Sequence, residues 1–279
     1  MKSKKKKWLI ISAVFVVVIL LYIWGFALQT VNYRMKSDKV KNVKIVFISD
    51  LHNCFYGGFD QSGLMDAVNE QAPDIVLFGG DVVDQWGGTE YALRLLKMIK
   101  DKYPCAYTPG NHEEEREDVE EFYDDVREIG VPILLGDRLD FDVNGEKVCV
   151  FGVLNHYAAG KDAQHTQLDE CYEQIDPECY NILLAHEPEQ IYKYDKNEEK
   201  PFDLVLSGHA HGGQWRLPKI LEQGLYAPGQ GLFPDLTNGK SRHINTDLIV
   251  SKGLAKPLRM IFIPRIFNRP ELTVIEFTK

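Results

Sequence analysis

Residues 43–52 read VKIVFISDLH, an apolar run that ends in an aspartate and, two positions later, a histidine. A short continuous apolar run of this kind is typical of a strand that is buried on both faces. A segment with helical periodicity follows from Gln61 to Gln71, and the same order of strand, polar turn and helix then recurs twice. This alternation predicts an α/β fold, with a sheet covered on both faces and right-handed crossovers.

The later elements continue the same pattern and then change it. The two recurrences have strands at Asp74–Phe78 and Cys105–Thr108, with helices at Thr89–Lys100 and Glu117–Ile129. The remaining strands are expected in a hairpin around Asn144-Gly145, at Tyr180–Ala185 and Asp203–Ser207, and at Leu248–Ser251 and Leu272–Phe277. Asn-Gly is a favoured two-residue hairpin turn, so an antiparallel pair is expected there.

Each of the five inner strands is followed by side chains of the kinds that bind metal ions. These are Asp50 and His52, then Asp81, then Asn111, then His186, then His209 and His211. Sites in open α/β sheets form beyond the carboxyl ends of the strands, and about one βαβ unit separates Asp50 from Asp81 and Asp81 from Asn111. We therefore expect the seven side chains to converge at one edge of the sheet.

The number and chemistry of these side chains favour two ions over one. Seven imidazole, carboxylate and amide groups are too many for one ion with an open position, but they suit two ions that share a carboxylate. Asp81 is the natural bridge, with one oxygen for each of two cations roughly 3.5 to 4 Å apart. Mixed oxygen and nitrogen ligands accept manganese, iron, zinc or cobalt, so the identity of the two divalent ions stays open.

Five sequence motifs, taken in order, resemble those of the calcineurin-like metallophosphoesterases. They are Asp50-Leu51-His52, Gly80-Asp81-Val82-Val83-Asp84, Gly110-Asn111-His112-Glu113, His186 and Gly208-His209-Ala210-His211. The resemblance covers about Val43 to the C-terminus and implies a layered α-β-β-α sandwich of two sheets. Gly212-Gly213-Gln214 and Phe267-Asn268-Arg269-Pro270-Glu271 are similar to the membrane-associated branch that includes UDP-2,3-diacylglucosamine pyrophosphatases.

The resemblance also implies a role for each residue of the motifs. Asp50, His52, Asp81 and His211 would hold the first ion, and Asp81, Asn111, His186 and His209 the second. His112 would be the catalytic residue that faces the phosphoryl group, where it stabilises charge or protonates the leaving oxygen. Asp84 and Glu113 would orient the ligands or His112. The other histidines, His156, His165 and His243, receive no role.

The activity implied is divalent-metal-dependent hydrolysis of a phosphodiester, phosphomonoester or diphosphate bond. A hydroxide that bridges the two ions would attack phosphorus in line, while the ions neutralise the phosphoryl oxygens. The rival from another class is a non-catalytic binding or scaffold protein, membrane-anchored and stabilised by metal, and a nuclease is a further alternative.

The charge of the chain bears on the nuclease alternative. Five of the 32 basic residues lie in the N-terminal flank, and the remaining 27 stand against 41 acidic residues, so the rest of the chain carries a formal charge of −14. Such a surface repels polyanions and disfavours a nucleic-acid partner.

The N-terminus predicts attachment to a membrane. Residues 1–7 form a basic flank with five lysines, and residues 8–28 are uncharged and long enough to cross about 30 Å of hydrocarbon as a transmembrane helix. We expect a retained signal anchor, although Gly25 and Ala27 leave a cleaved signal peptide open. The positive-inside rule places the flank in the cytoplasm and the catalytic domain outside, as a single-pass protein of the cell membrane.

Residues 29–42 are polar and basic and are expected to be a tether, which makes residues 43–279 the metallophosphoesterase domain. Because the tether holds the site near the bilayer, the preferred substrate is a small phosphate or diphosphate compound, lipid-linked or a nucleotide diphosphate. Residues 252–269 interleave basic and apolar side chains in an acidic protein. They fit either a patch for lipid headgroups or a partly buried loop, and both interpretations stay open.

Overall fold

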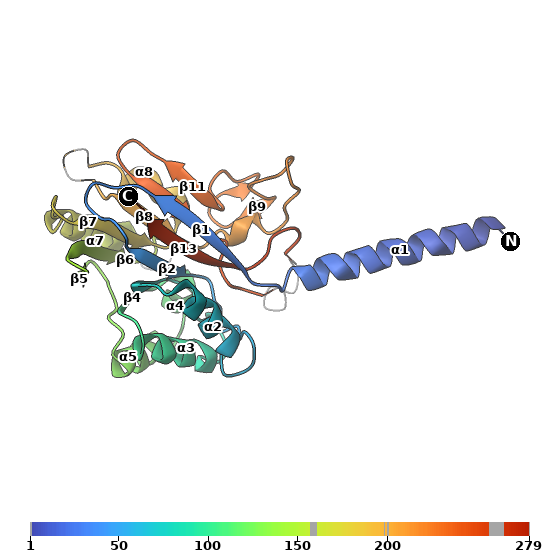
Figure 1. Cartoon of the computed structure of the whole chain (residues 1–279), viewed down its shortest axis with the longest axis horizontal. Coiled ribbons are helices and arrows are strands. Elements are labelled where there is room, and N and C mark those ends of the chain that lie inside the picture. The colour runs from blue at the N-terminus through green and yellow to red at the C-terminus, as the bar shows by residue number, and fades with distance from the viewer. Residues whose placement is uncertain (1, 157–160, 198, 200, 257–264, 279) are drawn as a thin grey trace.

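Two β-sheets face each other at the centre of the molecule (Figure 1). The computed structural model describes residues 2–156, 161–197, 199, 201–256 and 265–278. The first sheet has the strand order β1-β13-β2-β3-β4 and the second has the order β11-β12-β8-β7-β6-β5. In the first sheet β2, β3 and β4 are parallel, whereas β13 runs antiparallel to β2 and parallel to β1. In the second sheet β6, β7, β8 and β12 are parallel, and β5 and β11 are antiparallel to their neighbours.

The bounds of the strands follow from the apolar runs of the sequence. The first sheet consists of β1 Gln29–Met35, β2 Lys44–Ile48, β3 Ile75–Gly79, β4 Cys105–Thr108 and β13 Glu271–Phe277. The second consists of β5 Arg138–Val143, β6 Glu146–Val153, β7 Tyr180–Ala185, β8 Leu204–Ser207, β11 Gly239–Arg242 and β12 Asp247–Val250. A separate short hairpin pairs β9 Tyr226–Ala227 with β10 Gly231–Leu232.

Helices cover the outer face of each sheet. The helices are α1 Lys2–Trp24, α2 Ser62–Gln71, α3 Glu90–Lys100, α4 Asn111–Glu114, α5 Val119–Ile129, α7 Lys161–Glu173 and α8 Ile191–Tyr194, with 3₁₀ turns η1 Pro188–Gln190 and η2 His211–Gly213. In β2, Val46 and Ile48 pack toward the layer of α2, α3 and α5, whereas Ile45 and Phe47 pack between the sheets. A third cluster joins the second sheet to α7 and α8. The expected α-β-β-α layering with two sheets is confirmed.

The N-terminal segment differs from its sequence prediction. Helix α1 ends at Trp24, four residues before the expected end at Leu28. Its uncharged part, from Trp8 onward, is about 25 Å long at 1.5 Å per residue, short of the roughly 30 Å of a hydrocarbon layer. Among the residues that the structure describes, none of the helices is long and apolar enough to cross a membrane. The membrane-spanning helix predicted at residues 8–28 is therefore not confirmed.

The expected tether is partly a strand. Gln29–Met35 form β1, which pairs in parallel with β13 along its whole length. The physical reason is an alternation of period two, in which Val31, Tyr33 and Met35 occupy one face and polar residues the other. The folded domain therefore begins at Gln29 instead of Val43.

The basic and apolar segment 252–269 is only partly described. Arg259 lies outside the described residues, and Arg265 is 2% exposed. Arg265 donates through Nη2 to the carbonyl oxygens of Lys252, at 2.8 Å, and Gly253, at 3.3 Å. Because its guanidinium is buried, Arg265 agrees with the second of the two interpretations, a partly buried loop.

Candidate metal centre

The seven predicted ligands lie in loops at the carboxyl ends of strands from both sheets. Asp50 and His52 follow β2, Asp81 follows β3 and Asn111 begins α4 after β4. His186 follows β7, and His209 and His211 follow β8. The ends of β2 and β3 lie beside each other because the two strands are paired in parallel. The structure thus brings residues that are up to 161 positions apart in the sequence to one edge of the sandwich.

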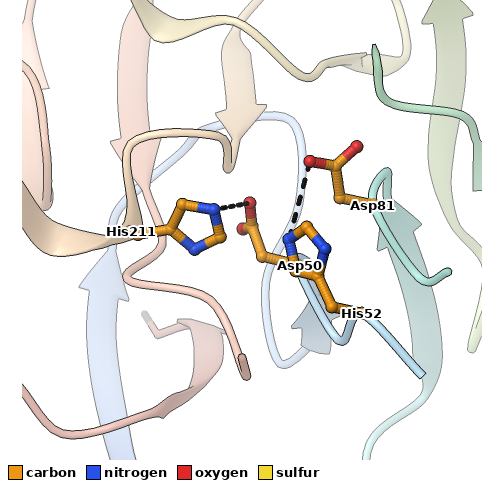
Figure 2. Close-up of side chains that lie close together, drawn as sticks. All are labelled: Asp50, His52, Asp81 and His211. Carbon is orange, nitrogen blue, oxygen red and sulfur yellow. Dashed lines mark ion pairs between the residues drawn. The ribbon is translucent and has the colours of Figure 1, made fainter. Parts of the chain in front are cut away.

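Four side chains form the first group (Figure 2). Asp50, His52, Asp81 and His211 each offer a ligand atom, and these atoms all lie within 4.8 Å of one another. His211 Nε2 is 3.8 Å from Asp50 Oδ1, and His52 Nε2 is 3.7 Å from Asp81 Oδ2. All four residues are buried, as a metal site that excludes bulk water requires.

The second group shares Asp81 with the first. Asp81, His186 and His209 also place ligand atoms within 4.8 Å of one another, and His186 Nε2 is 3.1 Å from Asp81 Oδ2. The same oxygen faces His52 in the first group, whereas Asp81 Oδ1 accepts a hydrogen bond from the His112 backbone N–H at 3.0 Å. Asp81 Oδ2 thus faces a histidine of each group, and the bridging role expected of Asp81 from the sequence stays a prediction.

The backbone at the centre is held in an uncommon conformation. Five of the seven predicted ligands have positive φ angles, namely Asp50, His52, Asp81, His209 and His211, with values between 46° and 65°. For residues other than glycine this left-handed conformation is disfavoured, and such strain gathers at functional sites. The close approach of the loops adds a steric limit, because a Cβ on Gly110 would lie 2.2 Å from Asp81 Oδ1. The loops are therefore shaped around the side chains that they carry.

The ligand atoms fit a metal because several of them have no hydrogen-bond partner within the protein. Among the described residues, five predicted ligands have a buried polar atom that forms no hydrogen bond: Asp50 Oδ2, Asp81 Oδ2, Asn111 Oδ1, His186 Nε2 and His211 Nδ1. Leaving a buried polar atom unsatisfied costs about 1 to 3 kcal/mol, so a cluster of five needs an explanation. Cations coordinated by these atoms would supply it.

The electrostatics of the cluster favour positive charge. Burial works to lower the pKa of His186, but the carboxylates of Asp81 and Asp50 outweigh it and raise that pKa to about 10. Burial, with the negative charge of Asp81, raises the pKa of Asp50, and burial together with the charge of His186 lowers the pKa of His209 to about 3. Burial also holds the pKa of His211 well below its ordinary value. The carboxylates thus draw in a cation, and His209 and His211 stay neutral, as ligation by imidazole requires.

A comparison with known families agrees with this geometry. The family model described as calcineurin-like phosphoesterase matches residues 43–213. The chain belongs to the calcineurin-like phosphoesterase family. The match spans the strands, helices and loops that carry all seven predicted ligands.

Two similar proteins have names that include the word metallophosphoesterase. An uncharacterized metallophosphoesterase of Helicobacter pylori is 31% identical over 198 residues, which cover 67% of this chain and 48% of that protein. The matched part is thus about half the length of this relative. A protein of Danio rerio named transmembrane protein with metallophosphoesterase domain is 26% identical, over 63% of this chain and 42% of its own.

Among solved structures, the sulfate thiohydrolase SoxB of Thermus thermophilus, in complex with glycerol, has a TM-score of 0.50 and 13% sequence identity. The similarity covers 79% of this chain and 54% of that one. At this level of identity the likeness supports the calcineurin-like fold alone.

Side chains outside the two groups orient the ligands of the calcineurin-like centre. His52 Nδ1 lies 2.8 Å from Asp84 Oδ1, and His186 Nδ1 lies 2.7 Å from the Gly79 carbonyl oxygen. Since the carbonyl only accepts, His186 donates through Nδ1 and turns its Nε2 toward the centre. Glu113 accepts backbone N–H bonds from Asp81 (2.8 Å), Val83 (3.0 Å) and Gly110 (2.7 Å). The roles predicted for Asp84 and Glu113 agree with these contacts.

His112 differs from the buried histidines by its exposure. Its side chain is 27% exposed, compared with 6% or less for His52, His186, His209 and His211. His112 Nε2 lies 4.0 Å from Asp81 Oδ2, and its ring centroid lies 4.7 Å from that of His52. It therefore borders the centre on a side that solvent reaches, as a residue facing the substrate would.

Two residues near the centre were not predicted as part of the site. Asn268, 1% exposed, donates through Nδ2 to the carbonyl oxygens of His211, at 2.7 Å, and Gln214, at 3.2 Å. Gly253 packs directly against Asp50 and has a φ of +69°. The signal for Asn268 was the motif Phe267–Glu271, whereas no sequence pattern points to Gly253.

Proposed function

We propose that this chain hydrolyses a phosphomonoester, phosphodiester or diphosphate bond with the help of two divalent ions. One observation carries the proposal: two groups of buried ligands share Asp81, whose Oδ2 faces His52 in one group and His186 in the other. Asp50, His52, Asp81 and His211 would hold one ion, and Asp81, Asn111, His186 and His209 the other. Ions bound there would supply Lewis-acid chemistry by polarising a phosphoryl oxygen and lowering the pKa of water.

The protein's own residues would contribute binding, orientation and proton transfer. His112, at the accessible side of the centre, is placed to donate a proton to the leaving oxygen. Its Nδ1 lies 3.4 Å from Asp84 Oδ1, so this carboxylate contacts both His112 and His52. Glu113 holds the loops after β3 and β4 together, which fixes the position of Asp81. The geometry favours an enzyme over a scaffold because a purely structural site needs no accessible histidine beside it.

The test is hydrolysis of bis-p-nitrophenyl phosphate by the full chain with added Mn²⁺. Asp81→Asn and removal of metal with a chelator should each abolish turnover. The matched control is Asp66→Asn, since Asp66 is exposed on α2 and far in the sequence from every ligand motif. Bound metal without hydrolysis of diester, monoester or diphosphate substrates supports the scaffold, and activity that survives in Asp81→Asn refutes the proposed site.

We further propose that α1 attaches the domain to a membrane and that the substrate is lipid-linked or a nucleotide diphosphate. The support is the exposed apolar surface of α1, in which the described side chains from Ile10 to Leu20 are all exposed, and the flank of lysines before it. A short apolar helix can be accommodated by local thinning of the bilayer and by snorkelling of flanking lysines. The Danio rerio relative is itself named a transmembrane protein. Retention of the full chain in the membrane pellet after carbonate washing is expected, and release into the supernatant would overturn the attachment.

A further inference from the structure

The end of α1 lies at the same edge of the sandwich as the metal centre. β2 runs toward the centre, β13 is antiparallel to β2, and β1 is parallel to β13. Gln29, the first residue of β1, is therefore aligned with Glu271, at the end of the sheet where β2 meets Asp50. The backbone closes this corner, because Gly253 accepts from the Glu271 N–H at 3.0 Å while Leu254 donates to the Asp50 carbonyl at 3.1 Å. Figure 1 shows α1 extending away from the domain on the side where β9 lies.

A basic cavity opens beside the end of α1. It has a volume of about 350 Å³, and its walls include the cations Arg216, Lys219 and Lys252. Glu222 also lines it, and the carboxylate of Glu271 lies 3.2 Å from Lys252 Nζ, so two of the three positive charges are offset. Lys219, which is exposed, has no ion pair among the described residues.

The cavity touches both the metal centre and α1. Arg216 donates through Nη1 to the carbonyl of Gly212, the residue after His211, at 3.2 Å. Phe267, another wall of the cavity, stacks edge-on against Trp24 with ring centroids 6.2 Å apart. Arg269 lies over the same Trp24 ring at 5.6 Å. Tryptophan and arginine at the end of an apolar helix are typical of the level of lipid headgroups.

Apolar side chains stand exposed around the cavity. Leu217 is 47% exposed and Ile220 is 82% exposed, and they lie on either side of Lys219. Cations that alternate with exposed apolar side chains are the composition of a surface that meets an anionic bilayer, because the apolar groups enter the interface and the cations pair with phosphates. An exposed apolar patch with a cation among its side chains marks an interaction site, and on an acidic protein it stands out from the rest of the surface.

We propose that Arg216, Lys219 and Lys252, with Leu217 and Ile220, form a docking surface for an anionic phospholipid bilayer. This proposal rests on the membrane attachment through α1. Docking of this surface would turn the metal-centre edge toward the headgroups, so a lipid-linked phosphate compound could reach the centre while its lipid stays in the bilayer. The domain would then hold one fixed orientation on the membrane instead of rotating freely about the end of α1.

An environment-sensitive fluorescent label tests this orientation without using activity. The full chain carrying Ile220→Cys is labelled and incorporated into lipid nanodiscs of phosphatidylcholine, with or without phosphatidylglycerol. The matched control is Ile244→Cys, because Ile244 is 78% exposed but precedes β12, at the opposite edge of the sandwich. All five native cysteines are buried, so the label reports the introduced position. We expect a blue shift at position 220 in discs with phosphatidylglycerol and none at position 244.

A second pair of variants tests the charge. In the chain labelled at position 220, Lys219→Gln should lower the ratio of docked to undocked protein about five-fold in discs with phosphatidylglycerol. This is the effect expected for the loss of one cation at an anionic surface. Lys147→Gln, in the hairpin at the opposite edge, should leave it unchanged. Added glycerol 3-phosphate should not reproduce the shift in phosphatidylcholine discs. If it does, the cavity binds a soluble phosphate and the bilayer docking is refuted.

The remaining outcomes distinguish failure of the docking surface from failure of the attachment through α1 or of the proposed hydrolysis. A chain that elutes apart from the discs refutes the attachment through α1, and the docking surface with it. Co-elution without a shift at position 220 refutes the docking surface alone, and loss of hydrolysis in Asp81→Asn stays an independent result. A shift that follows protein concentration instead of lipid composition would identify a second copy of the chain as the occupant and overturn the proposal.

Discussion

Replacing Gly253 by alanine should weaken metal binding although Gly253 is not a ligand. A Cβ at this position would lie 2.5 Å from the Asp50 Cβ and 2.6 Å from Asp50 Oδ2. Ordinary contacts begin at 3.4 Å, so the shortfall is 0.9 Å, and Asp50 or the backbone must move by about that much. Metal–ligand distances tolerate only about 0.2 Å, and disturbing the support of a ligand commonly costs about 10- to 100-fold in metal affinity. We expect a loss of that size.

The control for Gly253→Ala separates the collision from backbone strain. Gly253 has a φ of +69°, so alanine there also costs about 1 to 2 kcal/mol in backbone conformation. Gly145 has a φ of +84° but has no atom within 4 Å of an added Cβ, so Gly145→Ala carries the strain without the collision. Bound Mn²⁺ after equilibrium dialysis measures the affinity, and chemical denaturation measures the stability. The reasoning is refuted if Gly253→Ala binds Mn²⁺ like the wild type or if Gly145→Ala loses affinity equally.

Three further substitutions test single contacts of the centre and of the fold around it. His112→Ala should lower turnover by about 10²- to 10⁴-fold with metal content unchanged, because His112 lies beside the ligand groups; loss of metal would instead make it a ligand. Asp84→Asn should lower metal affinity about 10-fold or more, since Asp84 orients His52 at 2.8 Å, and unchanged affinity in a Mn²⁺ titration would contradict that role. Asn53→Ala should cost about 1 to 2 kcal/mol of unfolding free energy, because Asn53 Oδ1 accepts two backbone N–H bonds at the start of α3. An unfolding free energy that stays unchanged in Asn53→Ala on chemical denaturation would contradict the cap.

The layered fold was predictable where strands are buried on both faces. The runs at β4 and β7 have the predicted bounds, β8 begins one residue late, β3 is shifted by one residue, and β2 lies within the run that starts at Val43. β1 was missed because its polar residues suggested a linker, and only pairing with β13, some 240 residues later, makes it a strand. α7 was missed because it is largely polar and buries only a few side chains such as Leu168 and Cys171.

The site was predictable at the level of which residues converge. A polar ligand after each inner strand is a pattern visible in the sequence. Parallel pairing of the strands then brings these ligands to the same edge of the sheet. The left-handed backbone at Asp50 and Asp81 is not a sequence pattern, because it follows from how the loops close on one another. Gly253 and Asn268 could not be assigned for the same reason: their partners Asp50 and His211 lie 203 and 57 positions away.

The ligand side chains also join the two sheets, because some of their atoms form hydrogen bonds between loops of different strands. Asp50 Oδ1 accepts the His209 N–H at 2.8 Å, which ties the loop after β2 to the loop after β8, while Oδ2 forms no hydrogen bond. Asp81 uses Oδ1 for the His112 N–H and leaves Oδ2 unbonded, and His186 uses Nδ1 for the Gly79 carbonyl and leaves Nε2 unbonded. In Asp81 and His186, one atom fixes the scaffold and the other faces the centre. Because the Asp50–His209 and His186–Gly79 bonds cross between the sheets, the ligand geometry can form only when both sheets have docked, and the centre is therefore preorganised by the fold itself.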